Sequence, residues 1–336
     1  MVTWLNNARI VSIFAVVLLH VADIILVENG IGTEYWWAGN VFSTLVRWCV
    51  PVLVMISGAL LLDARKQESL AKFYSKRLSK ILIPMLFWAI FFSFWTFLHG
   101  FVDGAPPTYF TLLNNLVRGL PYEHLWFLYM ISGLYLFAPF LRIIFEHLEK
   151  KEIELLVISA FSIASINFIY MSFHGSGGPI LFFNWFLLYL PFFLIGDLIR
   201  RDNSKRRIFP LITFALSSLL TFVGYYFVSA QNELIGQAYF HGYLSMTVIP
   251  MSISMMYLLK LWNKPILNEH LGKQLSSLSF GIYLIHPIIL EIFNQTGYMK
   301  TVHPVISIPS ATAVIFAVSF AVAWMFYKTP YLKRVI

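Results

Sequence analysis

The chain alternates long apolar runs with short polar segments. A helix needs roughly 20 mainly apolar residues to cross about 30 Å of hydrocarbon, and ten runs meet this criterion. They cover residues 8–28, 40–62, 81–99, 124–145, 153–171, 183–200, 208–228, 239–261, 279–296 and 307–327. The pattern therefore predicts an all-α polytopic membrane protein with about ten transmembrane helices.

The connecting segments add one expectation about domain organisation. The longest are 64–80 and 100–123, and neither has room for a fused soluble domain. Residues 1–336 are therefore predicted to form a single transmembrane domain, with one interfacial helix in 100–123. The first run is too long for a signal peptide and carries His20 and Asp23, so we expect it to be retained.

The composition supports this class and excludes others. The chain is 59% hydrophobic and 12% charged, whereas soluble domains are about 45–50% apolar and about 25% charged. This argues against a water-soluble enzyme and against a disordered chain. The single cysteine, Cys49, excludes an intramolecular disulfide and a multi-cysteine metal site.

The basic residues predict the orientation in the membrane. With the N-terminus in the cytoplasm, all but three of the 24 lysines and arginines fall on the cytoplasmic side, the exceptions being Arg47, Arg118 and Lys300. Such an asymmetry is the positive-inside rule, and it predicts that both termini are cytoplasmic. The formal charge of +8 is thus explained by topology, and we expect the partner to be the lipid bilayer and not nucleic acid.

Ionisable residues inside the first run form a polar stripe. His20 follows Arg9 by eleven residues, about three helical turns or about 16 Å along the axis, and Asp23 lies three residues further on the same face. Charged groups in a spanning helix are costly and typically functional. The alternative for His20 is a neutral histidine that hydrogen-bonds a neighbouring helix.

Other polar positions admit a structural and a functional interpretation. Arg47 lies four residues before Pro51, and its structural interpretation is a cation that extends to the outer headgroups. His286 and Glu291 lie in the ninth run, where packing explains both. Histidines near the predicted outer interface, such as His241, are expected to be solvated.

The start of the third run is strongly basic. Lys76, Arg77 and Lys80 lie on adjacent faces of one helix end. They serve either cytoplasmic retention or phosphate binding, since guanidinium and ammonium groups pair well with phosphate oxygens. No P-loop, dinucleotide fingerprint or metal-binding motif is present in the sequence.

Five short motifs follow one another along the chain: NNARIVSIFAVVLLHVAD, RWCVPVLVMISGALL, KFYSKRLSKILIPMLFW, EHLWFLYMISGLYLFAP and LSFGIYLIHPII. In this order they resemble the integral-membrane acyltransferase 3 family of bacterial O-acyltransferases. The residues that carry the resemblance are Arg9, His20, Arg47, Pro51, Ser57, Gly58, Phe73, Arg77, Pro84, Trp88, His124, Leu125, Trp126, Phe127 and His286. Within the family, the length and the HLWF sequence are most similar to the type that acetylates enterobacterial common antigen. Lys80 replaces the usual second arginine, which keeps the charge but loses bidentate geometry.

The resemblance implies a bacterial inner-membrane enzyme that transfers an acyl group, usually acetyl, from cytoplasmic acetyl-CoA to a sugar hydroxyl of a surface or lipid-linked glycan. Arg9, Lys76, Arg77 and Lys80 are then expected to hold the phosphates of the donor. His20 is expected to act either as general base or as acyl carrier, with Asp23 supporting it and Arg47 stabilising the oxyanion.

The acceptor is expected to contact His124, Trp126 and His286. No permanently bound cofactor or metal is expected. The competing hypothesis is an exporter or flippase of a lipid-linked glycan, in which the polar stripe lines a translocation path and no bond is made.

Overall fold

The computed structural model describes residues 3–63, 68–174, 184–230 and 239–336. Within these ranges every regular element is a helix, in agreement with the predicted all-α fold. The helices are α1 (Thr3–Glu28), α2 (Glu34–Val46), α3 (Cys49–Leu61), α4 (Leu70–Val102), α5 (Tyr109–Arg118), α6 (Trp126–His147), α7 (Lys150–His174), α8 (Trp185–Arg201), α9 (Ile208–Ala230), α10 (Val248–Lys260), α11 (Glu269–Asn294), α12 (Tyr298–Thr301), α13 (Pro304–Lys328) and the 3₁₀ turn η2 (Leu332–Arg334).

Each predicted run corresponds to helical structure, with two corrections. In the described residues eight segments, with α2 and α3 counted together, are long and apolar enough to cross a membrane, and α8 and α10 are shorter. The run 239–261 is helical only from Val248, because residues 239–247 form consecutive turns. The helix expected within 100–123 is confirmed as α5, whose residues are all at least partly exposed.

The second correction concerns the run 40–62, which is not one continuous helix. It breaks at Arg47 and Trp48, between α2 and α3. A proline at position 51 has no N–H to donate to the carbonyl of residue 47, and its ring would clash with that carbonyl. The break therefore places Arg47 at a kink and not along a regular helix face.

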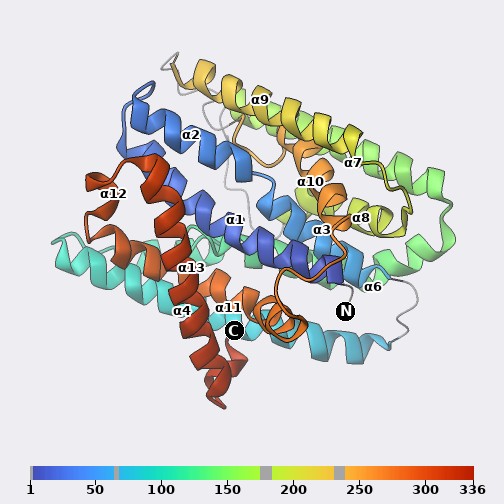
Figure 1. The fold of residues 1–336 in the computed structure, drawn as a ribbon. Helices are drawn as coiled ribbons and strands as arrows, with labels where there is room; N and C mark the ends of the chain where they lie inside the picture. Colours follow the sequence, from blue (N-terminus) through green and yellow to red (C-terminus); the bar gives the residue numbers. More distant parts are fainter. Residues whose placement is uncertain (1–2, 64–67, 175–183, 231–238) are drawn as a thin grey trace.

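Helix α1 lies at the centre of the bundle (Figure 1). It contacts α2, α3, α10, α11 and α13, whereas α7 and α9 lie on one side of the molecule and α4 on the other. Helices α4, α7 and α9 carry many exposed large apolar side chains, Leu86, Ile90, Ile158 and Phe209 among them. In a polytopic membrane protein such surfaces face lipid.

A close helix contact joins α3 to α8 through two glycines. A Cβ atom on Gly58 would lie 1.7 Å from the Phe193 carbonyl oxygen, and one on Gly196 would lie 2.0 Å from the Met55 carbonyl oxygen. Small residues permit such backbone approach between membrane helices. The Ser-Gly pair of the second motif thus has a packing role at Gly58.

Candidate active site

A basic pocket of about 270 Å³ opens beside the N-terminal part of α1. Its cationic residues are Arg9 from α1 and Arg77 and Lys80 from α4. Three of the four predicted phosphate-binding residues therefore meet in one cavity. Lys76 is exposed and does not line it.

The rest of this pocket is made of hydroxyl groups and apolar side chains. The hydroxyls come from Ser57, Tyr135, Ser276, Ser277, Ser279 and Tyr283. Arg9 Nη1 donates to Ser276 Oγ over 3.4 Å, and the buried Arg77 Nε has no hydrogen-bond partner. No carboxylate in the described part of the chain lines the pocket, so its charge suits an anion.

Three histidines from distant parts of the sequence meet next to this pocket. The ring centroid of His286 on α11 lies 5.2 Å from that of His20 on α1 and 5.7 Å from that of His124, in the turn before α6. His124 and His286 are buried. The structure thus brings together a predicted catalytic residue and two of the three predicted substrate contacts.

The hydrogen bonds of the cluster leave buried nitrogens without partners. His286 Nδ1 lies 2.7 Å from the Tyr283 carbonyl oxygen; a carbonyl only accepts, so Nδ1 carries the proton and Nε2 has a free lone pair. That Nε2 is buried without a partner. The His124 ring interacts with the Leu284 backbone, but neither of its nitrogens makes a hydrogen bond of normal geometry.

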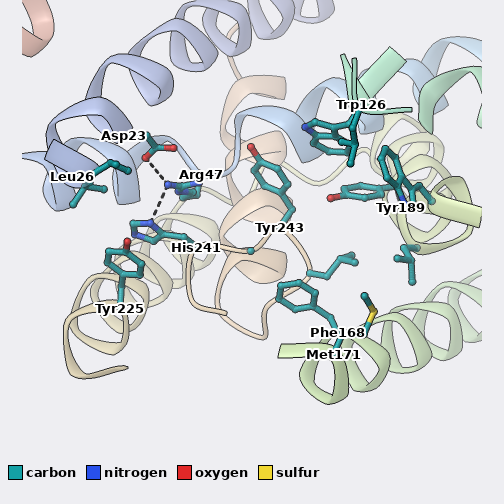
Figure 2. Close-up of a pocket in the computed structure, with 16 residues that line it drawn as sticks. Asp23, Leu26, Arg47, Trp126, Phe168, Met171, Tyr189, Tyr225, His241 and Tyr243 are labelled. Atoms are coloured by element: carbon teal, nitrogen blue, oxygen red, sulfur yellow. Dashed lines mark hydrogen bonds and ion pairs between the residues drawn. The ribbon is translucent and has the colours of Figure 1, made fainter. Parts of the chain in front are cut away.

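A second, aromatic cavity of about 610 Å³ lies at the other end of α1 (Figure 2). Its lining includes the aromatic side chains Trp126, Phe168, Trp185, Tyr189, Tyr225 and Tyr243. Trp126 lies close to two of these tyrosines, with ring centroids 5.4 Å from Tyr189 and 6.0 Å from Tyr243. This places the predicted substrate contact Trp126 in a wall of aromatic rings.

An ion pair lines the same cavity. Arg47 Nη2 donates to Asp23 Oδ1 over 2.6 Å and to His241 Nδ1 over 3.0 Å (Figure 2), and Ser43 Oγ donates to the same carboxylate oxygen over 2.7 Å. The hydrogen bonds of Asp23 therefore go to Arg47 and Ser43. Its support of His20 stays a prediction.

The sequence interpretation missed His241. It is buried and stacked on Tyr225, with ring centroids 3.5 Å apart, whereas a solvated histidine was expected. Because Arg47 has only donors, His241 Nδ1 accepts and Nε2–H donates to Thr44 Oγ1. Residues 239–247 form turns and carry no helical period, so no sequence pattern marks this contact.

The two cavities lie on either side of the histidine cluster. On α1, His20 lies between Ile13, which lines the basic pocket, and Asp23, which lines the aromatic cavity. On α6 the neighbouring residues Trp126 and Phe127 line the aromatic cavity and the basic pocket respectively. The predicted polar stripe on α1 thus connects two different chambers.

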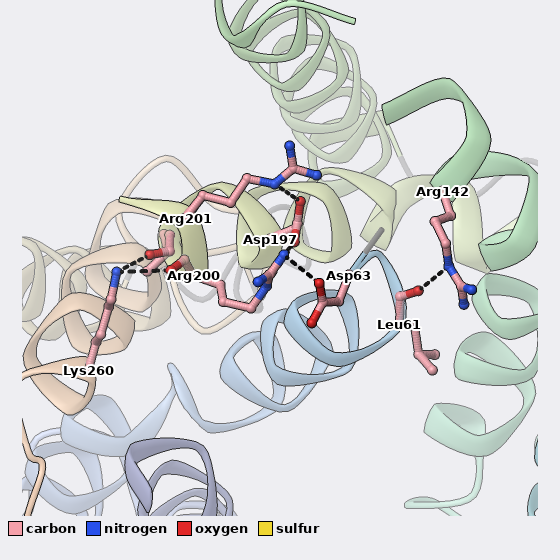
Figure 3. Close-up of polar contacts among 8 residues, drawn as sticks. Leu61, Asp63, Arg142, Asp197, Arg200, Arg201 and Lys260 are labelled. Atoms are coloured by element: carbon pink, nitrogen blue, oxygen red, sulfur yellow. Dashed lines mark hydrogen bonds and ion pairs between the residues drawn. The ribbon is translucent and has the colours of Figure 1, made fainter. Parts of the chain in front are cut away.

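Two further polar clusters have structural roles. At the basic end of the bundle, Asp197 on α8 pairs with Arg200 and Arg201, and Arg200 Nη2 lies 3.5 Å from Asp63 Oδ1 (Figure 3). Lys260 Nζ donates to carbonyl oxygens at the C-terminal end of α8, which stabilises a helix C-terminus. These contacts join α8 to α10 and to the segment that follows α3.

The other cluster surrounds Glu291 at the opposite end. This carboxylate accepts from Trp95 Nε1 over 2.7 Å and lies 3.0 Å from His99 Nδ1. The residue therefore joins α4 to α11, as the structural interpretation of its position expects.

Comparison with known proteins places the chain in a family. No curated protein and no solved structure matches the chain significantly. Residues 2–328, nearly the whole chain, match the acyltransferase domain of the acyltransferase 3 family. The chain therefore belongs to the acyltransferase 3 family, and it is a membrane acyltransferase.

Proposed function

We propose that the protein transfers an acyl group, most simply acetyl, from acyl-CoA in the basic pocket to a sugar hydroxyl of a glycan in the aromatic cavity. The observation that carries the proposal is the position of the histidine cluster. It lies between a chamber lined by cations and a chamber lined by aromatic rings, and it holds buried nitrogens without partners.

We infer the binding site of the acyl donor from the positive charge of the basic pocket. Coenzyme A carries several negative phosphate charges, and Arg9, Arg77 and Lys80 line one cavity beside serine hydroxyls. Charge-assisted hydrogen bonds of this kind are about twice as strong as neutral ones. Since coenzyme A is cytoplasmic, the basic end would face the cytoplasm of a bacterial inner membrane, as the positive-inside rule predicts.

The reacting groups meet at His20. His20 lies about 16 Å along α1 from Arg9, a distance that the flexible pantetheine arm spans. A sugar hydroxyl then attacks the thioester carbonyl carbon, the C–O bond forms and the C–S bond breaks. The hydroxyl proton passes to the imidazole and from there to the departing thiolate.

A second route uses the same residues. The imidazole nitrogen attacks the thioester carbonyl carbon, the C–S bond breaks, and coenzyme A leaves as the thiol with the imidazole N–H proton. The sugar hydroxyl then attacks the acyl-histidine, the C–O bond forms, the C–N bond breaks, and the hydroxyl proton returns to the imidazole. Both routes need His20 neutral and accessible, and its side chain is partly exposed. His124 and His286 are placed to position the acyl group or the imidazole.

We infer the binding site of the acceptor from the aromatic side chains of the larger cavity and from the ion pair that lines it. Sugar faces stack on rings such as Trp126 and Tyr243, and Arg47 Nε is a buried donor without a partner beside the cavity. We assign Arg47 to a hydrogen bond with the acceptor or the oxyanion, with Asp23 neutralising its charge. The narrower assignment to the enterobacterial common antigen type stays a prediction.

The test is binding and turnover of acetyl-CoA by the detergent-purified protein. Wild type is expected to bind and slowly hydrolyse acetyl-CoA. Arg77→Ala removes a cation from the basic pocket and should weaken binding about tenfold to a hundredfold, the value of one or two bonds to a charged group. His20→Ala should bind normally and lose about 10²–10⁴-fold in turnover.

Two exposed lysines of the same helix serve as controls. Lys72→Ala and Lys76→Ala should both leave acetyl-CoA binding within about twofold of wild type, because neither side chain lines the pocket. If wild type has no affinity for coenzyme A at any salt concentration that keeps it folded, the proposal is wrong. The chambers would then be interpreted as a path for a translocated glycan.

A further inference from the structure

A second basic cavity, of about 680 Å³, adjoins the basic pocket. The two cavities share Lys80, Ser277 and Phe280. The second one is completed by Lys333 and Arg334 from η2, after the last long helix. Neither residue belongs to a motif that carries the family resemblance.

The charged side chains that line this cavity are all positive. Three cations line it, and none of its lining residues within the described chain is an aspartate or glutamate. Lys333 and Arg334 are both exposed. An anion that entered would meet three positive groups that already face solvent, so little desolvation would oppose binding.

The segment that carries these cations is held in place. Trp88 Nε1 on α4 donates to the Val335 carbonyl oxygen over 2.7 Å, and Val335 is buried. Ile336 packs so close to Gly281 on α11 that a Cβ there would lie 3.2 Å from the Ile336 Cβ. These contacts hold η2 against α4 and α11. Lys333 and Arg334 therefore have a fixed place in the lining of the second basic cavity.

The basic pocket alone is small for the proposed donor. Its volume of about 270 Å³ is below the roughly 300–1,000 Å³ of pockets for drug-sized ligands, and acyl-CoA is larger than such ligands. Coenzyme A also has two separated anionic parts: a diphosphate next to the pantetheine arm, and a 3′-phosphate on the ribose. One cavity that leads toward the histidines and a second beside it match this division.

We propose that the second basic cavity binds the 3′-phosphorylated nucleotide end of acyl-CoA, with Lys333 and Arg334 contacting the 3′-phosphate. Lys80, which lines both cavities, then lies between the diphosphate and the 3′-phosphate. This inference rests on the proposed function, because it assigns a further part of the same donor to residues outside the basic pocket.

The test compares acetyl-CoA with 3′-dephospho-acetyl-CoA, which differs only in the contacted group. Dissociation constants are measured for wild type and for the double variant Lys333→Ala/Arg334→Ala. Wild type should bind acetyl-CoA about tenfold to a hundredfold more tightly than the dephospho compound. The double variant should bind both compounds equally, with the affinity that wild type has for the dephospho compound.

The matched control is Lys205→Ala/Arg206→Ala. It removes an exposed Lys-Arg pair of the same spacing, also at the basic end but outside both cavities. It should keep the full preference for acetyl-CoA, which separates a local contact from a general loss of charge. If Lys333→Ala/Arg334→Ala misfolds and binds neither compound, the same two dissociation constants are measured for the single variants Lys333→Gln and Arg334→Gln.

The outcomes separate the two proposals. If wild type binds both compounds equally, or if the variants keep the wild-type preference, Lys333 and Arg334 do not contact the 3′-phosphate, although the proposed function stands. If wild type binds neither compound, the proposed function fails and this inference fails with it.

Discussion

The two chambers of this protein use arginine in opposite ways. In the basic pocket, Arg77 faces hydroxyl groups and its Nε has no partner. In the aromatic cavity, Arg47 is paired with Asp23 at 2.6 Å and bonded to His241. An arginine without a carboxylate partner attracts an anion, whereas a neutralised one offers directional hydrogen bonds without net charge. The difference is consistent with the proposed anionic donor at one end and the proposed neutral sugar at the other.

The relative position of the chambers depends on the α3–α8 contact, so its loss should have the largest effect. Gly58→Ala would force a Cβ to within 1.7 Å of a backbone oxygen, which only a helix displacement relieves. We expect a loss of more than about 4 kcal/mol of stability, measured as the yield of monodisperse protein and its thermal midpoint. Gly272→Ala is the control because its added Cβ meets nothing within 4 Å outside its chain neighbours and its own helix backbone. A Gly58→Ala midpoint within a few degrees of wild type would contradict this account of the packing.

The second largest effect, again on stability, is expected at Arg47, the arginine that is paired with Asp23. Arg47→Ala leaves the Asp23 carboxylate without its cation and should destabilise the protein by roughly 2–4 kcal/mol. Arg77→Ala, by contrast, should leave the midpoint almost unchanged while it weakens acetyl-CoA binding. Adding Asp23→Ala to Arg47→Ala should recover part of the loss. Equal destabilisation by Arg47→Ala and Arg77→Ala would show that the two arginines do not differ as described.

A smaller effect is expected at the aromatic cavity. Trp126→Ala removes a ring near Tyr189 and Tyr243 and should raise the KM for the glycan acceptor about threefold to tenfold. The dissociation constant of acetyl-CoA should not change, because Trp126 does not line the basic pocket. Trp324→Ala, which changes an exposed tryptophan on α13, is the control. A weakened affinity for acetyl-CoA in Trp126→Ala would mean that the chambers are not separate.

The smallest effect tests the residue that departs from the family motif. Lys80→Arg restores bidentate geometry at a position that lines both basic cavities, and we expect acetyl-CoA affinity to rise about twofold to fivefold. Lys80→Met, which removes the charge at similar length, should lower it. Weaker binding by Lys80→Arg than by wild type would indicate that the cavity requires the compact ammonium group.

Prediction from the sequence succeeded for features that depend on a single helix. The apolar runs located the helices, and the helical period placed Arg9 and His20 on the face of α1 that leads from the basic pocket to the histidine cluster. It erred at the kink before Pro51 and at 239–247. In both places the backbone leaves the period on which the prediction rests.

The remaining features depend on which helices are neighbours. The meeting of His20 with His286 joins residues from α1 and α11, and the meeting of Asp23 with Arg47 and His241 joins three segments. Composition and helical period act locally, so the amino-acid sequence was enough to predict the membrane class, most of the helices and the polar stripe of α1. By contrast, the fold is needed to see that Trp126 and Phe127 line different chambers and that Lys333 and Arg334 adjoin Lys80, because these contacts come from the packing of segments that are distant in the sequence.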